Sequence, residues 1–206
     1  MRIDYNKHKL EDQDVNPNPI FQFEKWFQEA KDAHVHEPYA MTLATANAEG
    51  HPSARVVLMR RFDETGFVFF TNYLSRKGVD ILENPNAALL FFWQDLERQV
   101  RIEGTLEKVT REESEMYFQS RPHESKIGAW TSEQGRVIAD RKVLDERFKE
   151  FSLKYPEEHV PCPPHWGGYI LKPTCIEFWQ GRPSRLHDRI LFTLENGTWK
   201  MERLAP

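Results

Sequence analysis

Short apolar runs separated by turn-forming residues most constrain how this chain can fold. Three lie within residues 40–72, joined by turns with the sequences NAEGHP and DETG. Five more follow, at 87–94, 98–109, 168–173, 175–181 and 185–195. Asn196-Gly197 is typical of a hairpin turn that returns the chain to a last strand at 198–206. Strands joined by such short turns pair antiparallel, so we predict an α+β protein built on an antiparallel sheet or barrel.

Helical segments fall between and outside these strands. Residues 18–33 carry apolar side chains three and four positions apart, which predicts an amphipathic helix. Shorter helices are predicted at 75–85, 110–120 and 140–156. The first fifteen residues are polar, and we predict that they form a flexible arm on a single domain spanning 1–206.

Charge and composition exclude several classes of function. The net charge of −4 gives no basic field for nucleic acid or an anionic membrane. Cys162 and Cys175 form neither a disulfide framework nor a zinc pattern, and the histidines lack metal-ligand spacing. No Gly-rich loop marks a Rossmann or P-loop site. With no long apolar run and a polar N-terminus, a cytoplasmic location is expected.

Any anion site must therefore be a local cluster of cations. Ser75 as helix N-cap places Arg76 and Lys77 in the first turn, where positive charge is unfavourable unless an anion such as phosphate offsets it. On these residues alone, a solvent-exposed pair explains the pattern slightly better. Arg55 shares a strand face with Val57, so it is expected to be partly buried and to pair with either an anion or a carboxylate.

Two further stretches are ambiguous by themselves. Tyr117, Arg121 and Ser125 are spaced four apart and suit a phosphate, although Pro122 interrupts the helix and the tyrosine could simply pack on the core. Gln99 can hydrogen-bond a heteroaromatic ring, but most strand glutamines do not.

The stretch FWQGRPSRLHDRI, residues 178–190, gives the strongest signal. Read as a bent strand, it places Arg185, His187 and Arg189 on one face near Trp179, where like charges repel. The neighbouring apolar residues predict that the strand is covered, and buried cations need anions. A ligand with a phosphate and a polar ring would satisfy this group.

The motifs RLHDR, FWQG, SRKG, SRP…SKIGAW and RLAP, in this chain order, together resemble the pyridoxine/pyridoxamine 5′-phosphate oxidase family over about Arg2 to Pro206. The resemblance implies an FMN-binding split β-barrel with peripheral helices, working as a homodimer with flavin sites between the subunits. It also implies oxidation of pyridoxine or pyridoxamine 5′-phosphate to pyridoxal 5′-phosphate, with O₂ as acceptor. Peroxide would be released, with ammonia from the amine.

The resemblance further implies the site residues. FMN would be bound by Arg55, Val56, Val57, Leu58, Met59, Arg60, Phe70, Thr71, Ser75, Arg76, Lys77, Gln99, Gln134, Gly135, Trp179 and Arg189. The substrate would be bound by Arg60, Tyr117, Arg121, Ser125, Arg185 and His187, with the segment from Arg2 to Tyr5 covering it. Arg185 and His187 would orient the reacting group as the catalytic pair, and no metal is implied.

Three positions depart from the family's usual residues. Arg60 stands where lysine is common, Gly135 replaces a serine, and Phe70 replaces a tyrosine of many bacterial relatives. A guanidinium and an ammonium differ in reach and geometry, so Arg60 bears on substrate affinity.

Two other classes of protein suit the same cations. One is a carrier of flavin or vitamin B6 phosphate without turnover, which an assay for peroxide release would distinguish. The other is a split-barrel flavin reductase with another substrate, against which the RLHDR and SRP motifs argue.

Overall fold

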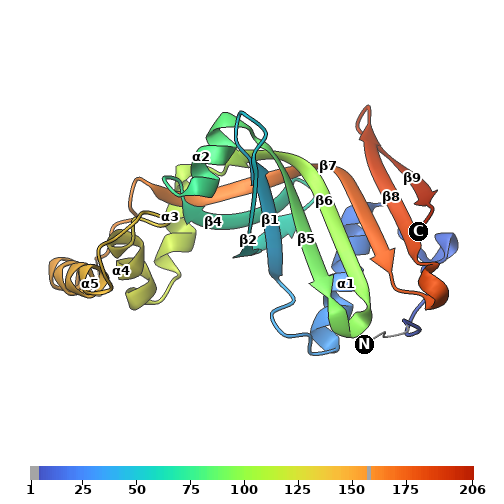
Figure 1. Ribbon diagram of the computed structural model, residues 1–206, viewed down its shortest axis with the longest axis horizontal. Coiled ribbons are helices and arrows are strands. Elements are labelled where there is room, and N and C mark those ends of the chain that lie inside the picture. The colour runs from blue at the N-terminus through green and yellow to red at the C-terminus, as the bar shows by residue number, and fades with distance from the viewer. Residues whose placement is uncertain (1–4, 157–158) are drawn as a thin grey trace.

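The computed structural model describes residues 5–156 and 159–206, and its centre is one curled antiparallel sheet (Figure 1). In this part of the chain the strand order is β2-β1-β5-β6-β7-β4-β3, with β8 paired to β7 and β9 to β8. The strands are β1 (Ala40–Ala46), β2 (Pro52–Leu58), β3 (Arg61–Asp63), β4 (Gly66–Asn72), β5 (Asn86–Trp93), β6 (Arg98–Lys108), β7 (Trp166–Gln180), β8 (Asp188–Glu195) and β9 (Thr198–Leu204). The predicted α+β split barrel is confirmed.

Strand β7 is the spine of the sheet. It pairs with β6 along one edge, while its other edge is divided: residues 166–171 pair with β4 and residues 175–180 with β8. A bulge opposite Glu103 and Gly104 lies next to Pro173, which has no N–H to donate. The two strands predicted at 168–173 and 175–181 are therefore one bulged strand. This division of the β7 edge separates the barrel from a two-stranded extension formed by β8 and β9.

The chain from Arg55 to Phe62, within the three strands predicted for residues 40–72, forms parts of two strands, β2 and β3. The Met59 N–H donates to Tyr39 O at 2.9 Å, whereas the Arg60 N–H donates to Val68 O at 2.8 Å. At this point the backbone therefore stops pairing beside β1 and begins to pair with β4. The three strands predicted within residues 40–72 are accordingly four.

Helices cover the ends of the curled sheet. Helix α1 (Pro19–Asp32) places Phe23 against Phe62, Phe67 and Phe91, with ring centroids 4.9–5.0 Å apart. Figure 1 shows α3, α4 and α5 at one end of the molecule and β8 and β9 at the other. The remaining helices are α2 (Arg76–Glu83), α3 (Arg111–Gln119), α4 (His123–Thr131) and α5 (Lys142–Lys154), with short 3-10 turns η1 (Asp12–Asp14), η2 (Gln94–Leu96) and η3 (Pro183–Arg185). Within the described ranges, no helix combines the length and apolar character needed to cross a bilayer.

Residues 5–15, the described part of the predicted flexible arm, lie against the sheet. Leu10 and Val15 belong to the hydrophobic core, with 3% and 7% of their surface exposed. Arg2, a predicted substrate contact, lies outside the described residues.

The chain before β8 corrects the prediction of one bent strand. Ser184 and Arg185 have φ angles of +58° and +62°, and β8 begins only at Asp188. Two consecutive left-handed residues turn the backbone and prevent strand pairing. Arg185, His187 and Arg189 therefore do not alternate along one strand face. The apolar residues of this stretch were predicted to be covered. Ile190 and Phe192 are buried, as predicted, but Leu186 is exposed.

Candidate functional site

A cluster of cations surrounds one carboxylate at the start of α2. Ser75 caps this helix by accepting the Gly78 N–H, as predicted. Arg55 Nη2 lies 3.8 Å from Asp80 Oδ2, and Arg55 Nη1 donates to Thr45 Oγ1 at 2.7 Å. Of the two partners expected for Arg55, the structure thus provides a carboxylate.

The electrostatics of this cluster favour an additional anion. Burial lowers the pKa of Arg55 against the opposing charge of Asp80, and Arg76 lowers it further. Burial also lowers the pKa of Lys77, as does the charge of Arg55. Burial acts to raise the pKa of Asp80, but hydrogen bonds from Thr45 and Ser53 and the charges of Arg55 and Arg76 outweigh it, so this pKa is lowered. Arg55 and Arg76 thus share the charge of Asp80, and Lys77 adds a third positive charge beside Arg55.

Residues distant in sequence complete the cluster. Lys77 Nζ donates to Gln134 Oε1 at 2.8 Å, and Thr71 Oγ1 donates to the same oxygen at 3.0 Å. A Cβ built on Gly135 would lie 3.9 Å from the backbone nitrogen of Arg76, so this glycine approaches the N-terminus of α2. The structure therefore brings together seven predicted flavin residues: Arg55, Thr71, Ser75, Arg76, Lys77, Gln134 and Gly135.

A second cation group lies on α3 and the turn after it. Phe70 and Tyr117 stack with centroids 4.0 Å apart, and the Arg121 guanidinium lies 4.8 Å above the ring of Trp166. Arg121 Nη1 is buried and has no hydrogen-bond partner among the described residues. Burial lowers the pKa of Arg121; Tyr117 opposes this shift and the nearby cation Arg60 adds to it. Ser125 follows in the first turn of α4.

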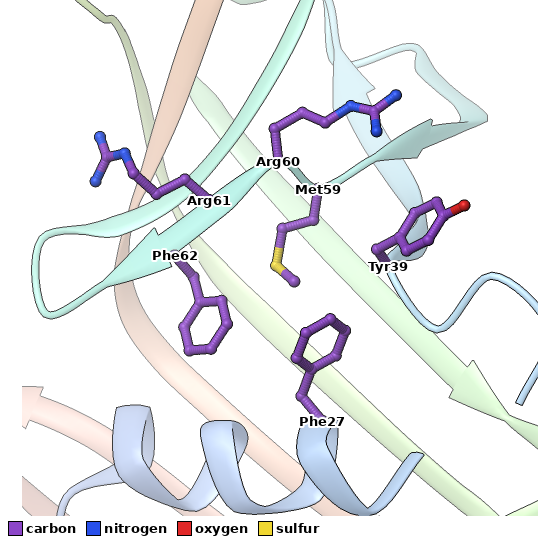
Figure 2. A pocket seen from close by; sticks show the side chains of 6 residues that line it. All are labelled: Phe27, Tyr39, Met59, Arg60, Arg61 and Phe62. Atoms are coloured by element: carbon purple, nitrogen blue, oxygen red, sulfur yellow. The ribbon is translucent and has the colours of Figure 1, made fainter. Parts of the chain in front are cut away.

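Cavities open on both sides of Arg60. One, of about 560 Å³, is lined by Arg60, Arg61, Phe70, Glu113, Met116, Tyr117 and Ser120. The other, of about 420 Å³, has an apolar floor of Phe27, Met59 and Phe62 (Figure 2). In Figure 2 the guanidinium groups of Arg60 and Arg61 point away from this floor. Arg60 also lies 5.9 Å from the ring of Tyr117, so it borders the same cavity as this residue, which is predicted to bind the substrate phosphate.

The third group lies where β6, β7 and β8 run side by side. Gln99 pairs in register with Trp179, which pairs with Arg189. The rings of Trp179 and His187 have centroids 4.6 Å apart, and Tyr5 lies 5.8 Å from Trp179. This group therefore offers ring surfaces together with polar groups, as expected from the sequence.

Arg189 has its partners within the chain. Its Nε and Nη2 donate to Glu177 at 2.7 and 3.1 Å, and its Nη1 donates to Ala205 O at 3.0 Å. Arg101 Nη2 lies 2.9 Å from the same carboxylate. Arg189 therefore needs no ligand anion, contrary to the prediction, because Glu177 balances its charge.

His187 is held in a defined state. The Arg182 N–H donates to His187 Nδ1 at 3.1 Å, so the neutral ring carries its proton on Nε2. Burial and the charge of Arg185 lower the pKa of His187, against the opposing charge of Asp188. The neutral imidazole thus presents Nε2–H as a hydrogen-bond donor.

Sequence reasoning missed Asp80 and Glu177. Each is an acid inside an apolar stretch, VDIL in α2 and CIEFW in β7, and each is buried against an arginine. Like Arg55, both lie on a covered face, where a charged residue needs a partner, and this signal was present in the sequence.

The predicted residues lie on two faces of the sheet. Arg55 is in register with Leu43, on the buried side. Gln99 and Trp179 align with Phe92, on the opposite side, where Phe92 is 52% exposed. Within predicted residues 55–60, Val56 and Leu58 likewise face this outer side. In the described residues of one chain, no contact joins the two groups.

The fold and these clusters define an antiparallel split-barrel protein with partly buried and exposed cations suited to phosphate-bearing ligands. The family model described as pyridoxamine 5′-phosphate oxidase matches residues 27–155, and that of the pyridoxine 5′-phosphate oxidase C-terminal dimerisation region matches residues 166–206. The chain belongs to the pyridoxamine 5′-phosphate oxidase family.

Individual relatives agree with this membership. Proteins named pyridoxine/pyridoxamine 5′-phosphate oxidase from Burkholderia thailandensis and Burkholderia mallei are 58% and 57% identical over 209 residues, covering 100% of this chain and 97% of theirs. The structure of PhzG from Burkholderia lata, in complex with tetrahydrophenazine-1-carboxylic acid, is 30% identical with a TM-score of 0.89 and covers 96% of this chain and 98% of that one. An FMN-binding protein from Nostoc punctiforme shares the fold, at 17% identity, a TM-score of 0.73 and coverage of 93% and 100%.

Proposed function

We propose that this chain is an FMN-dependent oxidase that converts pyridoxine or pyridoxamine 5′-phosphate to pyridoxal 5′-phosphate. The observation that carries the proposal is the unpartnered, buried Nη1 of Arg121, next to Arg60 and the cavity lined by Tyr117. A buried guanidinium without an acceptor is costly, and a phosphate oxygen would satisfy it. The names of the relatives at 57–58% identity support this choice of substrate.

The cluster at α2 fits the phosphate of FMN. Arg55 and Arg76 share the charge of Asp80 there, Lys77 adds a third positive charge, and the backbone N–H groups of the α2 N-terminus add positive potential. When bound, FMN supplies the hydride acceptor and the route by which electrons reach O₂ and give hydrogen peroxide. In this proposal Arg55, Arg76 and Lys77 hold the phosphate, and Gln134 orients Lys77.

We further propose that the working unit is a homodimer. One chain carries the α2 cluster with Arg55 and the ring-binding group of Gln99, Trp179 and His187 on different faces of its sheet. Two copies related by a twofold axis can place the α2 cluster of one against the ring group of the other. The match of residues 166–206 to a dimerisation region supports this arrangement.

The residues of the chain then have separable roles. Arg60, Tyr117, Arg121 and Ser125 hold the substrate phosphate. His187 donates through Nε2–H to an oxygen of the substrate and, with Arg185, orients the reacting carbon. Because Nδ1 already accepts the Arg182 N–H, the neutral ring is a donor and not a base. Holding the two reactants in contact lowers the barrier.

The test begins with the absorbance spectrum of the purified protein, in which flavin bands are expected, followed by oxygen uptake with each phosphorylated substrate. Arg185→Ala and His187→Ala should keep bound flavin and lose about 10²-fold or more in kcat/KM. Arg141→Ala, an exposed cation at the N-cap of α5, is the control. Unchanged turnover in both site variants would refute their assignment.

Two other outcomes identify the alternatives. Flavin binding with no peroxide release would indicate a carrier. Because PhzG from Burkholderia lata binds tetrahydrophenazine-1-carboxylic acid, this acid belongs in the same assay, and turnover of it alone would assign a different substrate.

A further inference from the structure

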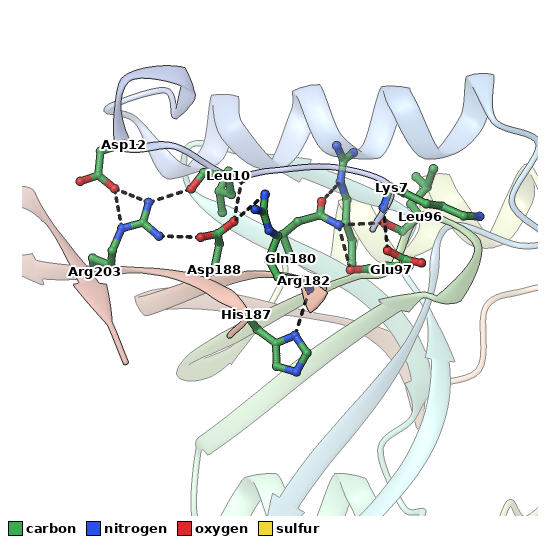
Figure 3. Close-up of polar contacts among 11 residues, drawn as sticks. Lys7, Leu10, Asp12, Leu96, Glu97, Gln180, Arg182, His187, Asp188 and Arg203 are labelled. Carbon is green, nitrogen blue, oxygen red and sulfur yellow. Dashed lines mark hydrogen bonds and ion pairs between the residues drawn. The ribbon is translucent and has the colours of Figure 1, made fainter. Parts of the chain in front are cut away.

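The N-terminal segment is fastened to the last strand of the protein by a single arginine. Arg203 of β9 donates through Nη2 to Leu10 O at 2.7 Å, through Nε to Asp12 Oδ1 at 2.9 Å, and through Nη1 to Asp188 Oδ1 at 3.0 Å (Figure 3). One guanidinium thus joins residues 10–12, β8 and β9.

Asp188 contributes the second half of this connection. Its other oxygen, Oδ2, accepts the Leu10 N–H at 3.1 Å and lies 3.8 Å from Arg182 Nη1. The Asp188 side chain is 19% exposed, so these charge-assisted bonds are partly shielded from water. Asp188 directly follows His187, whose ring is fixed by the Arg182 backbone. The same short stretch therefore holds both the N-terminal segment and the imidazole.

A second attachment lies closer to the N-terminus. The Lys7 N–H donates to Glu97 Oε2 at 3.1 Å, and Lys7 Nζ donates to Asp95 O at 2.6 Å. Glu97 is 5% exposed, so the first of these bonds is largely sheltered from solvent. Residues 7–12 are therefore attached at both ends of a short span.

These attachments determine where Tyr5 lies. Its ring is 5.8 Å from that of Trp179 and 6.0 Å from that of His187. A Cβ built on Gly181 would come within 2.8 Å of Tyr5 Cβ and 3.0 Å of Glu97 Cβ. Glycine at position 181 thus leaves the space that Tyr5 occupies.

We propose that Arg203 and Asp188 are positioning residues: by holding residues 7–12 against β8 and β9, they place Tyr5 on His187 and Trp179 and so order the substrate-binding side of the site. Besides these residues, the segment is held by Leu10 and Val15 in the core and by the hydrogen bonds of Lys7. The clamp, defined as Arg203, Asp188, Asp12 and the backbone of Leu10, therefore acts on the site through the N-terminal segment. This inference rests on the proposed function only in assigning His187 to the substrate.

The first measurement reports on the segment itself and needs no turnover. Limited trypsin digestion of the flavin-loaded protein, followed by mass spectrometry, measures cleavage after Lys7 and Lys9. Arg203→Ala should accelerate this cleavage about tenfold, as expected from the loss of one or two charge-assisted hydrogen bonds. Lys200→Ala is the matched control, because Lys200 lies on the same strand and pairs only with exposed Glu202 among the described residues. Unchanged cleavage in Arg203→Ala overturns the clamp.

The second measurement separates positioning from general stability. Arg203→Ala should raise KM for the phosphorylated substrate about tenfold while kcat changes less than about threefold and flavin remains bound. Arg203→Lys should restore part of the KM, because lysine keeps the charge but reaches fewer acceptors. Asp188→Asn should act in the same direction, and its effect should not add to that of Arg203→Ala. Faster cleavage with unchanged KM overturns the link to the site.

A milder variant keeps the test decisive if Arg203→Ala does not fold. Asp12→Asn leaves Arg203 and Asp188 in place and alters only an exposed acceptor on η1, so cleavage and KM should move by a smaller factor in the same direction. No change in either quantity with this variant, alongside an unfolded Arg203→Ala, assigns Arg203 to the fold alone and overturns the proposal. Absence of turnover in the unsubstituted protein would instead refute the proposed function, while the digestion result stands.

Discussion

Replacing Asp80 by asparagine tests the electrostatics of the α2 cluster. Asp80 Oδ2 accepts hydroxyl hydrogen bonds from Thr45 and Ser53, both at 2.7 Å, and lies 3.8 Å from Arg55 Nη2. Asparagine keeps the shape and an acceptor oxygen but removes the charge. The substitution therefore isolates what the negative charge contributes.

The expected loss follows from these contacts. A hydrogen bond to a charged group contributes about 1.5–3 kcal/mol and a neutral one about 0.5–1.5 kcal/mol, so two weakened bonds cost about 2 kcal/mol. The attraction to Arg55 adds about 1 kcal/mol, well below the roughly 4 kcal/mol of a bare pair at an effective dielectric constant of about 20. The smaller figure is appropriate because Arg55 is 20% exposed and retains its bonds to Leu43 O and Thr45 Oγ1. We expect the free energy of unfolding to fall by about 3 kcal/mol.

The pH dependence gives the sharper test. Hydrogen bonds and neighbouring cations lower the folded-state pKa of Asp80 despite its burial, whereas the unfolded value is about 3.9. A lowered carboxyl pKa contributes stability that is present above the unfolded pKa and lost as pH falls through the folded pKa. Urea unfolding of flavin-free Asp80→Asn and unsubstituted protein, at one protein concentration, should therefore show the same difference at pH 5.5, 7 and 8. A difference that changes between pH 8 and pH 5.5 would mean that burial dominates and the reasoning is wrong, because a raised carboxyl pKa makes the unsubstituted protein more stable as pH falls.

Three further results are expected. Arg76→Ala combined with Lys77→Ala should weaken FMN binding about 10–100-fold in a flavin-fluorescence titration; Arg141→Ala with Lys142→Ala, an equivalent pair at the start of α5, is the control, and equal affinities would exclude the α2 phosphate site. Phe23→Ala should reduce the free energy of unfolding by about 3–5 kcal/mol, and Phe21→Ala, on the same helix but 46% exposed, by less than about 1 kcal/mol. Because the pKa of His187 is lowered, kcat/KM should show no histidine titration between about pH 7 and 9; a rise there would contradict a neutral ring.

Local signals predicted much of the fold, and distant pairings decided the rest. The helix starts at Ser75 and Thr110 and the turn at Asn196-Gly197 follow from hydrogen bonds within a few residues, and the structure has all three. The break between β2 and β3 depends on Val68 accepting the Arg60 N–H, which periodicity does not reveal. A strand that changes neighbours has the same alternation as one that does not.

The candidate site, like the fold, was predictable in part from local sequence. Motif resemblance selected Lys77, Thr71 and Gln134, which the structure joins through one amide oxygen. It could not show that Arg189 is paired with Glu177, because that pair is set by the register of β7 and β8. Nor could it show which nitrogen of His187 is protonated, since this depends on the left-handed turn at Ser184 and Arg185.

The separation of Arg55 and Trp179 on opposite faces of one sheet has a genetic consequence in the proposed homodimer. Each chain would contribute Arg55 to one site of the dimer and His187 to the other. Two defective alleles, one damaged at Arg55 and one at His187, could therefore rescue each other when expressed together. A hybrid pair would contain one fully damaged and one fully intact site. With random association, half of the pairs are hybrids, and recovered activity should approach about a quarter of normal.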